Sequence, residues 1–198
     1  MNTETLKLFS PEYQKIIDQV LLEKSYLQDI LNIIKHSRTA IQYIENQTPE
    51  ICLAVIEQHD HVLNYIKKQS PQICLAAVQK SGLELEYVKE QTPEICLAAV
   101  KNSGWALEYV PKELKTPELC LIAVQQEGMS LEYVPEELQT PEICLAAVQQ
   151  NGQSLEHVPE ELKTPEICLA AVQQDGESLY YVPKELKTPE LCLVAVQR

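Results

Sequence analysis

Seven cysteines mark a repeat that runs through most of the chain. Cys52, Cys74 and Cys96 are spaced by 22 residues, and every later step to Cys192 is 24 residues. Each of the five glycines follows one of these cysteines by eight positions. Self-similarity at a period of about 20 to 50 residues is typical of stacked supersecondary units. The chain is therefore expected to form an array rather than a single compact bundle.

The first half of each unit carries the signals of a short helix, as residues 140–152 illustrate. Thr140 suits the N-cap, and Pro141 suits the first helical position, where a missing N–H costs nothing. Gly152 is expected to end the helix in the left-handed conformation. Six consecutive apolar residues, 143–148, leave no polar face, so copies on both sides must cover this helix.

The second half of each unit, Leu-Glu-Tyr-Val in three copies, predicts a short helix or 3₁₀ turn. In the 24-residue copies a proline follows, as at Pro135, and a second short turn is expected because proline ends a helix. The corresponding segments of the 22-residue copies, 67–69 and 89–91, contain no proline. There we expect one continuous short helix.

The pattern extends upstream, since residues 31–44 align with residues 97–110 without a gap. Residues 1–25 are expected to include an amphipathic helix that caps the array. The expected fold is all-α, an α-solenoid of about eight 22–24-residue repeats with this N-terminal capping helix. Residues 26–110 hold the 22-residue-type repeats and residues 111–198 the 24-residue-type repeats, in one continuous solenoid.

The cysteines are expected to be free and buried. Equivalent residues of stacked helices lie about 8–10 Å apart, whereas a disulfide needs Cα atoms within about 7 Å. Each cysteine is flanked by apolar residues, where a thiol behaves as a small hydrophobic group. No Cys-x-x-Cys pair exists, and His59 and His61 have no third ligand nearby in sequence, so we expect no metal and no cofactor. Reduced thiols favour the cytoplasm.

The formal net charge is −13, and residues 103–198 contribute −10 of it. Such a surface repels phosphate backbones, so it disfavours direct nucleic-acid binding and favours a basic protein partner. No apolar run approaches the roughly 20 residues that a membrane span requires. The N-terminal residues lack the layout of a signal peptide. We therefore expect a cytoplasmic protein without membrane contact.

The unit resembles a tandem-repeat family known as domain of unknown function 4116. The resemblance rests on residues 131–138, LEYVPEEL, followed by residues 145–152, LAAVQQNG, and it covers residues 26–198. The family occurs in bacteria, including intracellular ones, and in phages and large DNA viruses, so the cytoplasm of a host cell is an alternative location. The resemblance implies a helical array without a known catalytic activity.

The position after the glycine varies most between copies, and variable positions are the ones available for recognition. It holds His61, Leu83, Trp105 and Met129, followed by Gln153 and Glu177. Trp and Met are enriched in interface cores, which predicts a partner-binding strip centred on Trp105. The alternative is that these side chains fold back and cover the adjacent turn.

A tyrosine row and a glutamate row accompany this position. The tyrosine row consists of Tyr43, Tyr65, Tyr87, Tyr109, Tyr133 and Tyr181, with His157 in the sixth copy. The tyrosines are interpreted as rings packed between copies, with the hydroxyl bonded to a backbone group. Glu108, Glu132 and Glu156 precede that row and are predicted to contact a basic partner. The alternative is a solvated face without a binding role.

The function expected from these features is non-enzymatic binding of a protein partner through an extended surface. No catalytic motif occurs, and the cysteines have no neighbouring base in sequence. The alternative function is an acidic inhibitor that occupies a nucleic-acid-binding site of a host protein, as a viral anti-defence factor would. In addition, Leu191, Leu193 and Val194 form an apolar end that predicts self-association as a homodimer.

Overall fold

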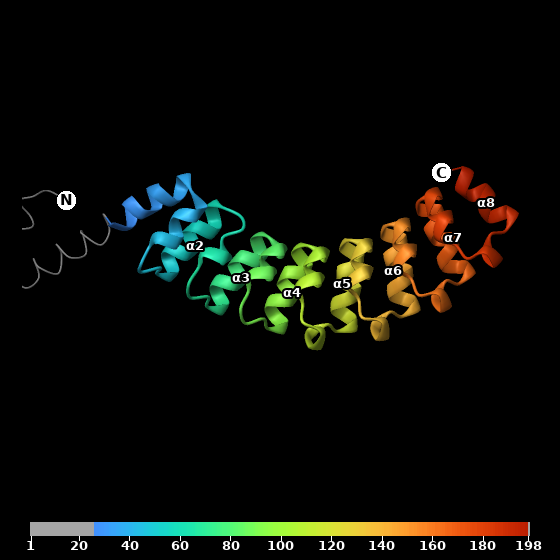
Figure 1. The fold of residues 1–198 in the computed structure, drawn as a ribbon, viewed down its shortest axis with the longest axis horizontal. Helices are drawn as coiled ribbons and strands as arrows, with labels where there is room; N and C mark the ends of the chain where they lie inside the picture. Colours follow the sequence, from blue (N-terminus) through green and yellow to red (C-terminus); the bar gives the residue numbers. More distant parts are fainter. Residues whose placement is uncertain (1–25, 198) are drawn as a thin grey trace, which may run out of the picture. The chain divides into compact units, whose positions relative to one another are not determined.

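The computed structural model describes residues 26–197, and all regular structure among them is helical (Figure 1). The chain forms two compact units, Met1–Lys68 and Gln69–Arg198. The expected all-α repeat fold is confirmed, because consecutive helices pack on one another in a repeating pattern. The predicted capping helix within residues 1–25 lies outside the described residues.

Unit 1 is built from four helical segments in its described part. Residues 26–36 are helical, and η2 (Arg38–Tyr43), α2 (Pro49–Gln58) and η3 (Leu63–Tyr65) follow. The 3₁₀ segment η2 packs on both α2 and η3. Ile34, Ile41, Val55 and Leu63 are fully buried and form the core of this unit.

Unit 2 repeats one α-helix and one 3₁₀ segment, and its α-helices follow one another in chain order (Figure 1). The α-helices are α3 (Pro71–Lys80), α4 (Pro93–Asn102), α5 (Pro117–Gln126), α6 (Pro141–Gln150), α7 (Pro165–Gln174) and α8 (Pro189–Val196). The 3₁₀ segments are η4 (Gly82–Tyr87), η5 (Gly104–Tyr109), η7 (Gly128–Tyr133), η9 (Gly152–His157) and η11 (Gly176–Tyr181). Each α-helix packs against the next, and each 3₁₀ segment against the next, so the copies form two layers.

The α-helices begin as predicted. In α6 the Thr140 hydroxyl accepts a hydrogen bond from the Ile143 N–H at 3.3 Å, and the equivalent bond occurs at every helix from α2 to α8. A proline occupies the first helical position each time. Helices α2 to α7 contain ten residues each. The cap and the proline therefore set the same start in every copy.

The middle of each α-helix is covered by its neighbours, also as predicted. In α6, Ile143, Cys144, Ala147 and Val148 are buried, and the two residues between them are half-buried. In the layer of 3₁₀ segments a leucine takes the buried position, for example Leu155, which is fully buried. A single copy could not remove this apolar surface from water by itself, so stacking is required.

The segments after the 3₁₀ helices follow the proline pattern only in part. The 24-residue copies contain the expected second turn, as η6 (Lys112–Leu114), η8 (Glu136–Leu138), η10 (Glu160–Leu162) and η12 (Lys184–Leu186). The continuous helix expected in the 22-residue copies is wrong, because η4 ends at Tyr87 and residues 89–91 are not helical. The Lys89 N–H instead donates to the side chain of Gln69 at 3.0 Å, a bond that holds the chain out of the helical conformation.

The predicted left-handed glycine is also wrong, since no described glycine has a positive φ. Asn151 ends α6 in an extended conformation, and Gly152 then opens η9. A Cβ atom on Gly152 would instead collide with the carbonyl oxygen of Ala171 in the next copy. Glycine is required here because two backbones approach closely, and not because of helix handedness.

The cysteines are buried as expected. All seven are free thiols, and every one except the half-buried Cys192 is buried. Burial raises the pKa of Cys96 and of Cys144 to about 11, because the thiolate loses its hydration. These thiols therefore behave as packing groups and not as nucleophiles.

This burial predicts selective labelling of one cysteine. At pH 8 a thiol with a pKa of about 11 is about one thousandth ionised, and it is also covered by its neighbours. We expect one cysteine, Cys192, to react rapidly with a chromogenic disulfide reagent, and the other six to react more than about 100-fold more slowly. The Cys192→Ser variant should lose the fast phase. Rapid reaction of several thiols in the folded protein would contradict the prediction.

Candidate functional site

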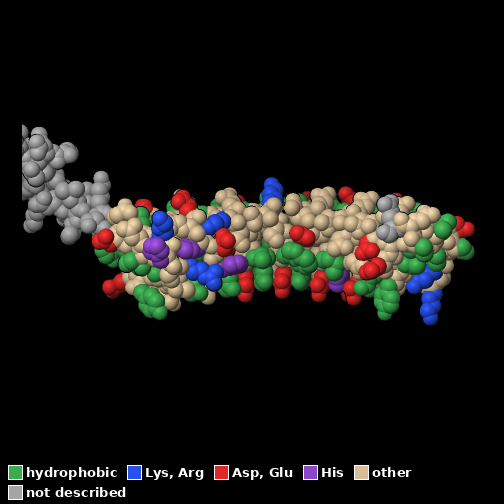
Figure 2. Space-filling view, turned by 90° about the horizontal axis from the view of Figure 1, so that it is seen from above, with side chains coloured by type: hydrophobic (Ala, Val, Ile, Leu, Met, Phe, Trp, Pro, Cys, Tyr) green, Lys and Arg blue, Asp and Glu red, His purple; other side chains and the backbone are tan. Residues whose placement is uncertain are grey.

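Aromatic and acidic side chains recur at equivalent positions of the 3₁₀ segments of unit 2, and we call this set the aromatic–acidic strip. Its members are half-buried aromatic or apolar residues and exposed glutamates. They are Leu83, Trp105, Met129, Tyr87, Tyr109, Tyr133, His157, Tyr181, Glu86, Glu108, Glu132 and Glu156. Figure 2 shows acidic side chains in a row along one edge of the repeats, with hydrophobic side chains beside them.

Trp105 links the row that follows the glycines, Leu83, Trp105 and Met129, to the tyrosine row. Its ring meets the ring of Tyr133 edge to face, with centroids 6.2 Å apart and an interplanar angle of 72°. Tyr133 belongs to the next copy, so the indole lies across the boundary between copies. Leu83 and Met129 occupy the same repeat position as Trp105 and are likewise half-buried. Trp105 thus covers part of a neighbour and still presents surface to solvent.

His61 departs from the other members of its repeat position. It lies in unit 1, is exposed, and has a φ of 56°, a positive value for a residue other than glycine. The left-handed conformation occurs at the residue after Asp60, which holds the glycine position. His61 therefore shapes a turn of unit 1 and does not belong to the strip as defined in unit 2.

The prediction that the tyrosine rings are packed between copies is wrong. They are half-buried in unit 2, and Tyr43 of unit 1 is 83% exposed. Their hydroxyls meet carboxylates: hydrogen bonding to Glu86 raises the pKa of Tyr87, and hydrogen bonding to Glu156 raises the pKa of Tyr181. Glu156 and Tyr181 come from consecutive copies, so the two rows alternate along the strip.

Burial and then the charge of Glu108 raise the pKa of both Tyr109 and Tyr133. Glu108 therefore lies near one tyrosine of its own copy and one of the next. Such a neighbourhood offers a ring face and a negative charge side by side. This combination suits an arginine or lysine side chain, whose cation is attracted both to the ring and to the carboxylate.

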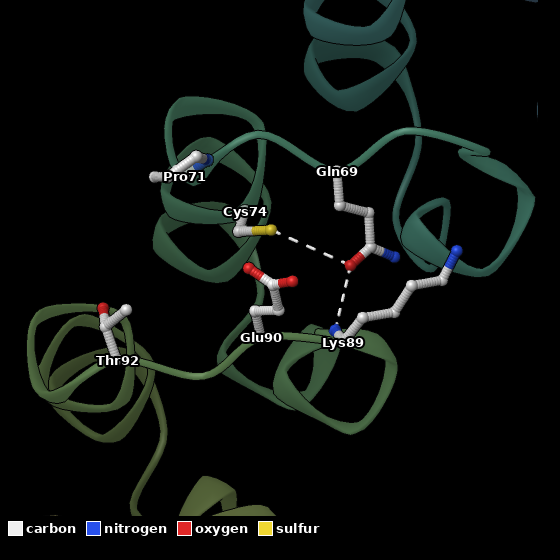
Figure 3. A pocket seen from close by; sticks show the side chains of 6 residues that line it. All are labelled: Gln69, Pro71, Cys74, Lys89, Glu90 and Thr92. Carbon is white, nitrogen blue, oxygen red and sulfur yellow. Dashed lines mark hydrogen bonds between the residues drawn. The ribbon is translucent and has the colours of Figure 1, made fainter.

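A second repeated contact joins the copies at the residue directly before each capping Thr or Ser, which we call the bridging position. In Figure 3 the Gln69 side chain extends from this position toward the next copy. Its Nε2 donates to the Tyr87 carbonyl at 2.8 Å, and its Oε1 accepts from the Lys89 N–H at 3.0 Å and from the Cys74 thiol at 3.9 Å. Gln47 makes the same two backbone contacts, to Tyr65 and Lys67.

A third contact joins the copies at the glycines. The Gly152 N–H donates to Gln174 Oε1 at 2.7 Å, and Gln174 Nε2 donates back to the Gln150 carbonyl at 3.3 Å. Gln150 and Asn102 bridge their neighbours in the same way. These side chains satisfy the backbone groups at the helix ends, so they hold the array together and are not available for a partner.

The predicted self-association residues differ in exposure. Leu191 is buried, Val194 is half-buried, and Leu193 is 60% exposed. Leu191 and Val194 line an apolar cavity together with Leu169 of α7. Self-association through these residues stays a prediction.

The described residues contain no group of three or more His, Cys, Asp or Glu side chains that could hold a metal ion. Across residues 26–197, no helix has both the length and the apolar character needed to cross a bilayer. The ionisable groups with shifted pKa values in the strip are tyrosines, and their pKa values rise.

Residues 92–139 and residues 140–187 each match the family described as Domain of unknown function (DUF4116). This part of the chain belongs to the DUF4116 family. Each DUF4116 match begins at a capping threonine and spans two 24-residue copies, so one family unit contains two α-helices. The resemblance stated from the sequence is confirmed over this narrower span. No curated protein and no solved structure matched the chain.

Sequence reasoning missed the bridging position, although its pattern is legible. This position holds only Gln or Lys in all seven copies where it precedes a capping Thr or Ser, at residues 47, 69, 91, 115, 139, 163 and 187. Both side chains are long and end in N–H donors. The available signal was a position directly before the helix cap that holds one of only two long polar residues in every copy.

Proposed function

We propose that this protein is a non-enzymatic repeat scaffold that binds a protein partner through the aromatic–acidic strip. The observation that carries this proposal is the contact of Trp105 with Tyr133. It joins the variable position after the glycine to the tyrosine row of the next copy. Large rings that are half-buried keep their rotamers while exposing area, and tryptophan and tyrosine are the residues most enriched in binding hot spots.

The chemistry of the strip favours a basic partner. Glutamates alternate with tyrosine rings, and residues 103–198 have a net charge of −10. A partner segment with arginine or lysine side chains would place one cation beside each ring and carboxylate pair. The same charge repels the phosphates of a nucleic acid, so direct nucleic-acid binding is not part of the proposal. No cofactor is required for this function.

Replacing Trp105 by alanine tests the proposal. We expect the affinity for the partner to fall about thirtyfold, which is about 2 kcal/mol, because a central hot-spot ring is lost. The free energy of unfolding should fall by only about 1 kcal/mol, the value of one aromatic pair. Affinity capture from the native cell with immobilised protein identifies the partner, and calorimetry with the purified partner then measures the affinity.

Ile33→Ala is the matched control, because Ile33 is 59% exposed in unit 1 and lies outside the strip. It should leave the affinity unchanged. The proposal fails if Trp105→Ala binds as tightly as the original chain. It also fails if that variant loses several kcal/mol of stability, since Trp105 would then be a packing residue.

The row of glutamates favours a second candidate, an acidic inhibitor that occupies a nucleic-acid-binding site of another protein. Binding dominated by charge weakens steeply with salt, whereas binding dominated by the rings does not. Affinities measured at low and high ionic strength therefore separate the two functions. Competition between the partner and an oligonucleotide for binding would support the inhibitor.

A further inference from the structure

The bridging positions of the 22-residue and 24-residue copies face different backbone groups. A bridging side chain faces the backbone of the residue that lies twenty positions later, in the next copy. For Gln69 this is Lys89, whose N–H donates to the glutamine oxygen. In the 24-residue copies that residue is a proline, which has no N–H. An acceptor such as a glutamine oxygen loses its donor there, whereas a lysine needs only acceptors.

Lysine occupies the bridging position at two of the four copy boundaries where a proline faces it, at Lys115 and Lys163. Lys115 Nζ donates to the Tyr133 carbonyl at 2.8 Å. Lys163 is buried, with 8% of its surface exposed, and its Nζ donates to Glu160 at 2.6 Å. The Lys115 ammonium joins two copies, whereas the Lys163 ammonium pairs with a carboxylate of its own copy. The bridging position thus holds a cation in both cases.

Gln91 and Gln139 are the two glutamines that face a proline, and the oxygen of Gln91 still accepts from the Cys96 thiol. Gln139 has no such donor. Its side chain faces Pro159, and while Nε2 donates to the Val134 carbonyl at 3.0 Å, Oε1 is buried without a hydrogen-bond partner. The same copy boundary has His157 in the tyrosine row, and its Nε2 is also buried without a partner. Buried polar atoms without partners are rare in native proteins, and here the two residues that carry them line one cavity.

This cavity has a volume of ≈ 590 Å³ and an acidic lining. Glu136, Glu160 and Glu161 line it together with Gln139 and His157. Glu136 stands three residues before Gln139, as Glu160 stands three residues before Lys163. Glu136 is therefore the equivalent of Glu160, but the lysine with which Glu160 pairs is replaced here by Gln139.

We propose that this cavity binds a primary ammonium group, supplied by a lysine side chain of the protein partner. An ammonium has three donors and no acceptor, and a glutamine oxygen, an imidazole nitrogen and a carboxylate, as carried by Gln139, His157 and Glu136, can each accept a hydrogen bond from it. It would take the place that the chain's own lysines fill at Lys115 and Lys163. The choice of a protein as the source rests on the proposed function of the strip, whereas the ammonium chemistry rests on the cavity alone.

The test is a titration of the whole chain with Nα-acetyl-lysine amide, followed by NMR at the His157 ring and the Gln139 side-chain amide. We expect saturable shifts at millimolar concentration at both groups. Nα-acetyl-norleucine amide, which has the same apolar stem without the ammonium, should produce none. Absence of saturation with the lysine probe, or equal shifts with the norleucine probe, overturns the proposal and leaves the two atoms to water.

Two variants sharpen the result. Gln139→Lys places an internal ammonium in the cavity, so the lysine probe should bind at least about tenfold more weakly while the melting temperature stays equal or rises. Gln91→Lys is the matched control, because Gln91 also faces a proline but its oxygen accepts from the Cys96 thiol at 3.4 Å. It should leave the shifts at His157 unchanged. Unaltered probe binding in Gln139→Lys would overturn the assignment.

Two further experiments test the source of the ammonium and distinguish failure of the cavity proposal from failure of the proposed function. Spermidine that binds more tightly than a lysine-containing peptide would assign the cavity to a small amine and overturn a protein source. Trp105→Ala should keep the binding of Nα-acetyl-lysine amide, because the probe is too small to span both places. If that binding persists while Trp105→Ala leaves partner affinity intact, the strip fails as the interface and the cavity stands.

Discussion

Replacing Gly152 by alanine is expected to lower the free energy of unfolding by about 2–3 kcal/mol, although the change adds one methyl group. The added Cβ would meet the Ala171 carbonyl oxygen, the Ser178 hydroxyl at 2.6 Å and the Asp175 Cβ at 3.0 Å. Two of these three atoms belong to backbone or to a Cβ, so neither can rotate away. Relief requires the copies to separate.

Separation of the copies would also break a hydrogen bond. The Gly152 N–H donates to Gln174 in the next copy, and that bond depends on the same close approach of η9 to α7. The energy of a repeat array resides largely in contacts between nearest neighbours. The damage should therefore appear as weaker coupling between α6 and α7 rather than as unfolding of one copy.

Chemical denaturation followed by circular dichroism measures this loss, and hydrogen exchange locates it. Amides of α7 and α8 should lose more protection than those of α3 and α4, which lie farther from the altered boundary. Gln149→Ala is the matched control, because it changes an exposed side chain of α6 three residues before the glycine. A Gly152→Ala protein as stable as this control would show that the copies can separate at little cost.

The helix starts and the buried helix faces could be predicted from the sequence because local rules determine them. Thr140 and Pro141 act on the backbone within one turn, and the apolar run after them requires cover whatever surrounds it. The free, buried state of Cys144 followed from spacing and flanking residues alone. Each of these features depends on the chain within a few residues, and each copy repeats the evidence.

The features that could not be predicted depend on the distance between copies. Gly152 carries a helix-end signal in sequence, yet its role follows from the Ala171 carbonyl, which lies 19 residues away. Likewise the partner of Gln69 is Lys89, and no local rule relates the two. The sequence predicts backbone partners for the tyrosine hydroxyls, because the offset that places Glu156 beside Tyr181 arises only when the copies stack.

The same distinction explains why the candidate site emerged only in part. Trp105 could be predicted from variation between copies at the position after the glycine, whereas the glutamate row could be predicted because the same residue recurs from copy to copy. The cavity beside Gln139 needed a comparison in space, since glutamine there looks like the glutamines of the 22-residue copies. Its meaning changes only because Pro159 faces it and lacks a donor.

Truncation of Leu155 to alanine should cost about 3–4 kcal/mol, the largest stability loss expected for a single side chain described here. Leu155 is fully buried in η9, and η9 packs on the α-helices of two copies and on the 3₁₀ segments at either side. Removal of its terminal carbons leaves a cavity at a point where four elements meet. Because those elements are held in place by the flanking copies, they cannot collapse into the space.

Leu193→Ala provides the comparison, since it makes the same chemical change on α8 at a side chain that is 60% exposed. Its effect should stay within about 0.5 kcal/mol. Urea denaturation measures both variants, and the Leu155→Ala transition should also broaden, because weaker coupling between neighbours lowers cooperativity in a repeat array. Equal losses for the two leucines would mean that the 3₁₀ layer does not form a core and that the copies are held together by the α-helices alone.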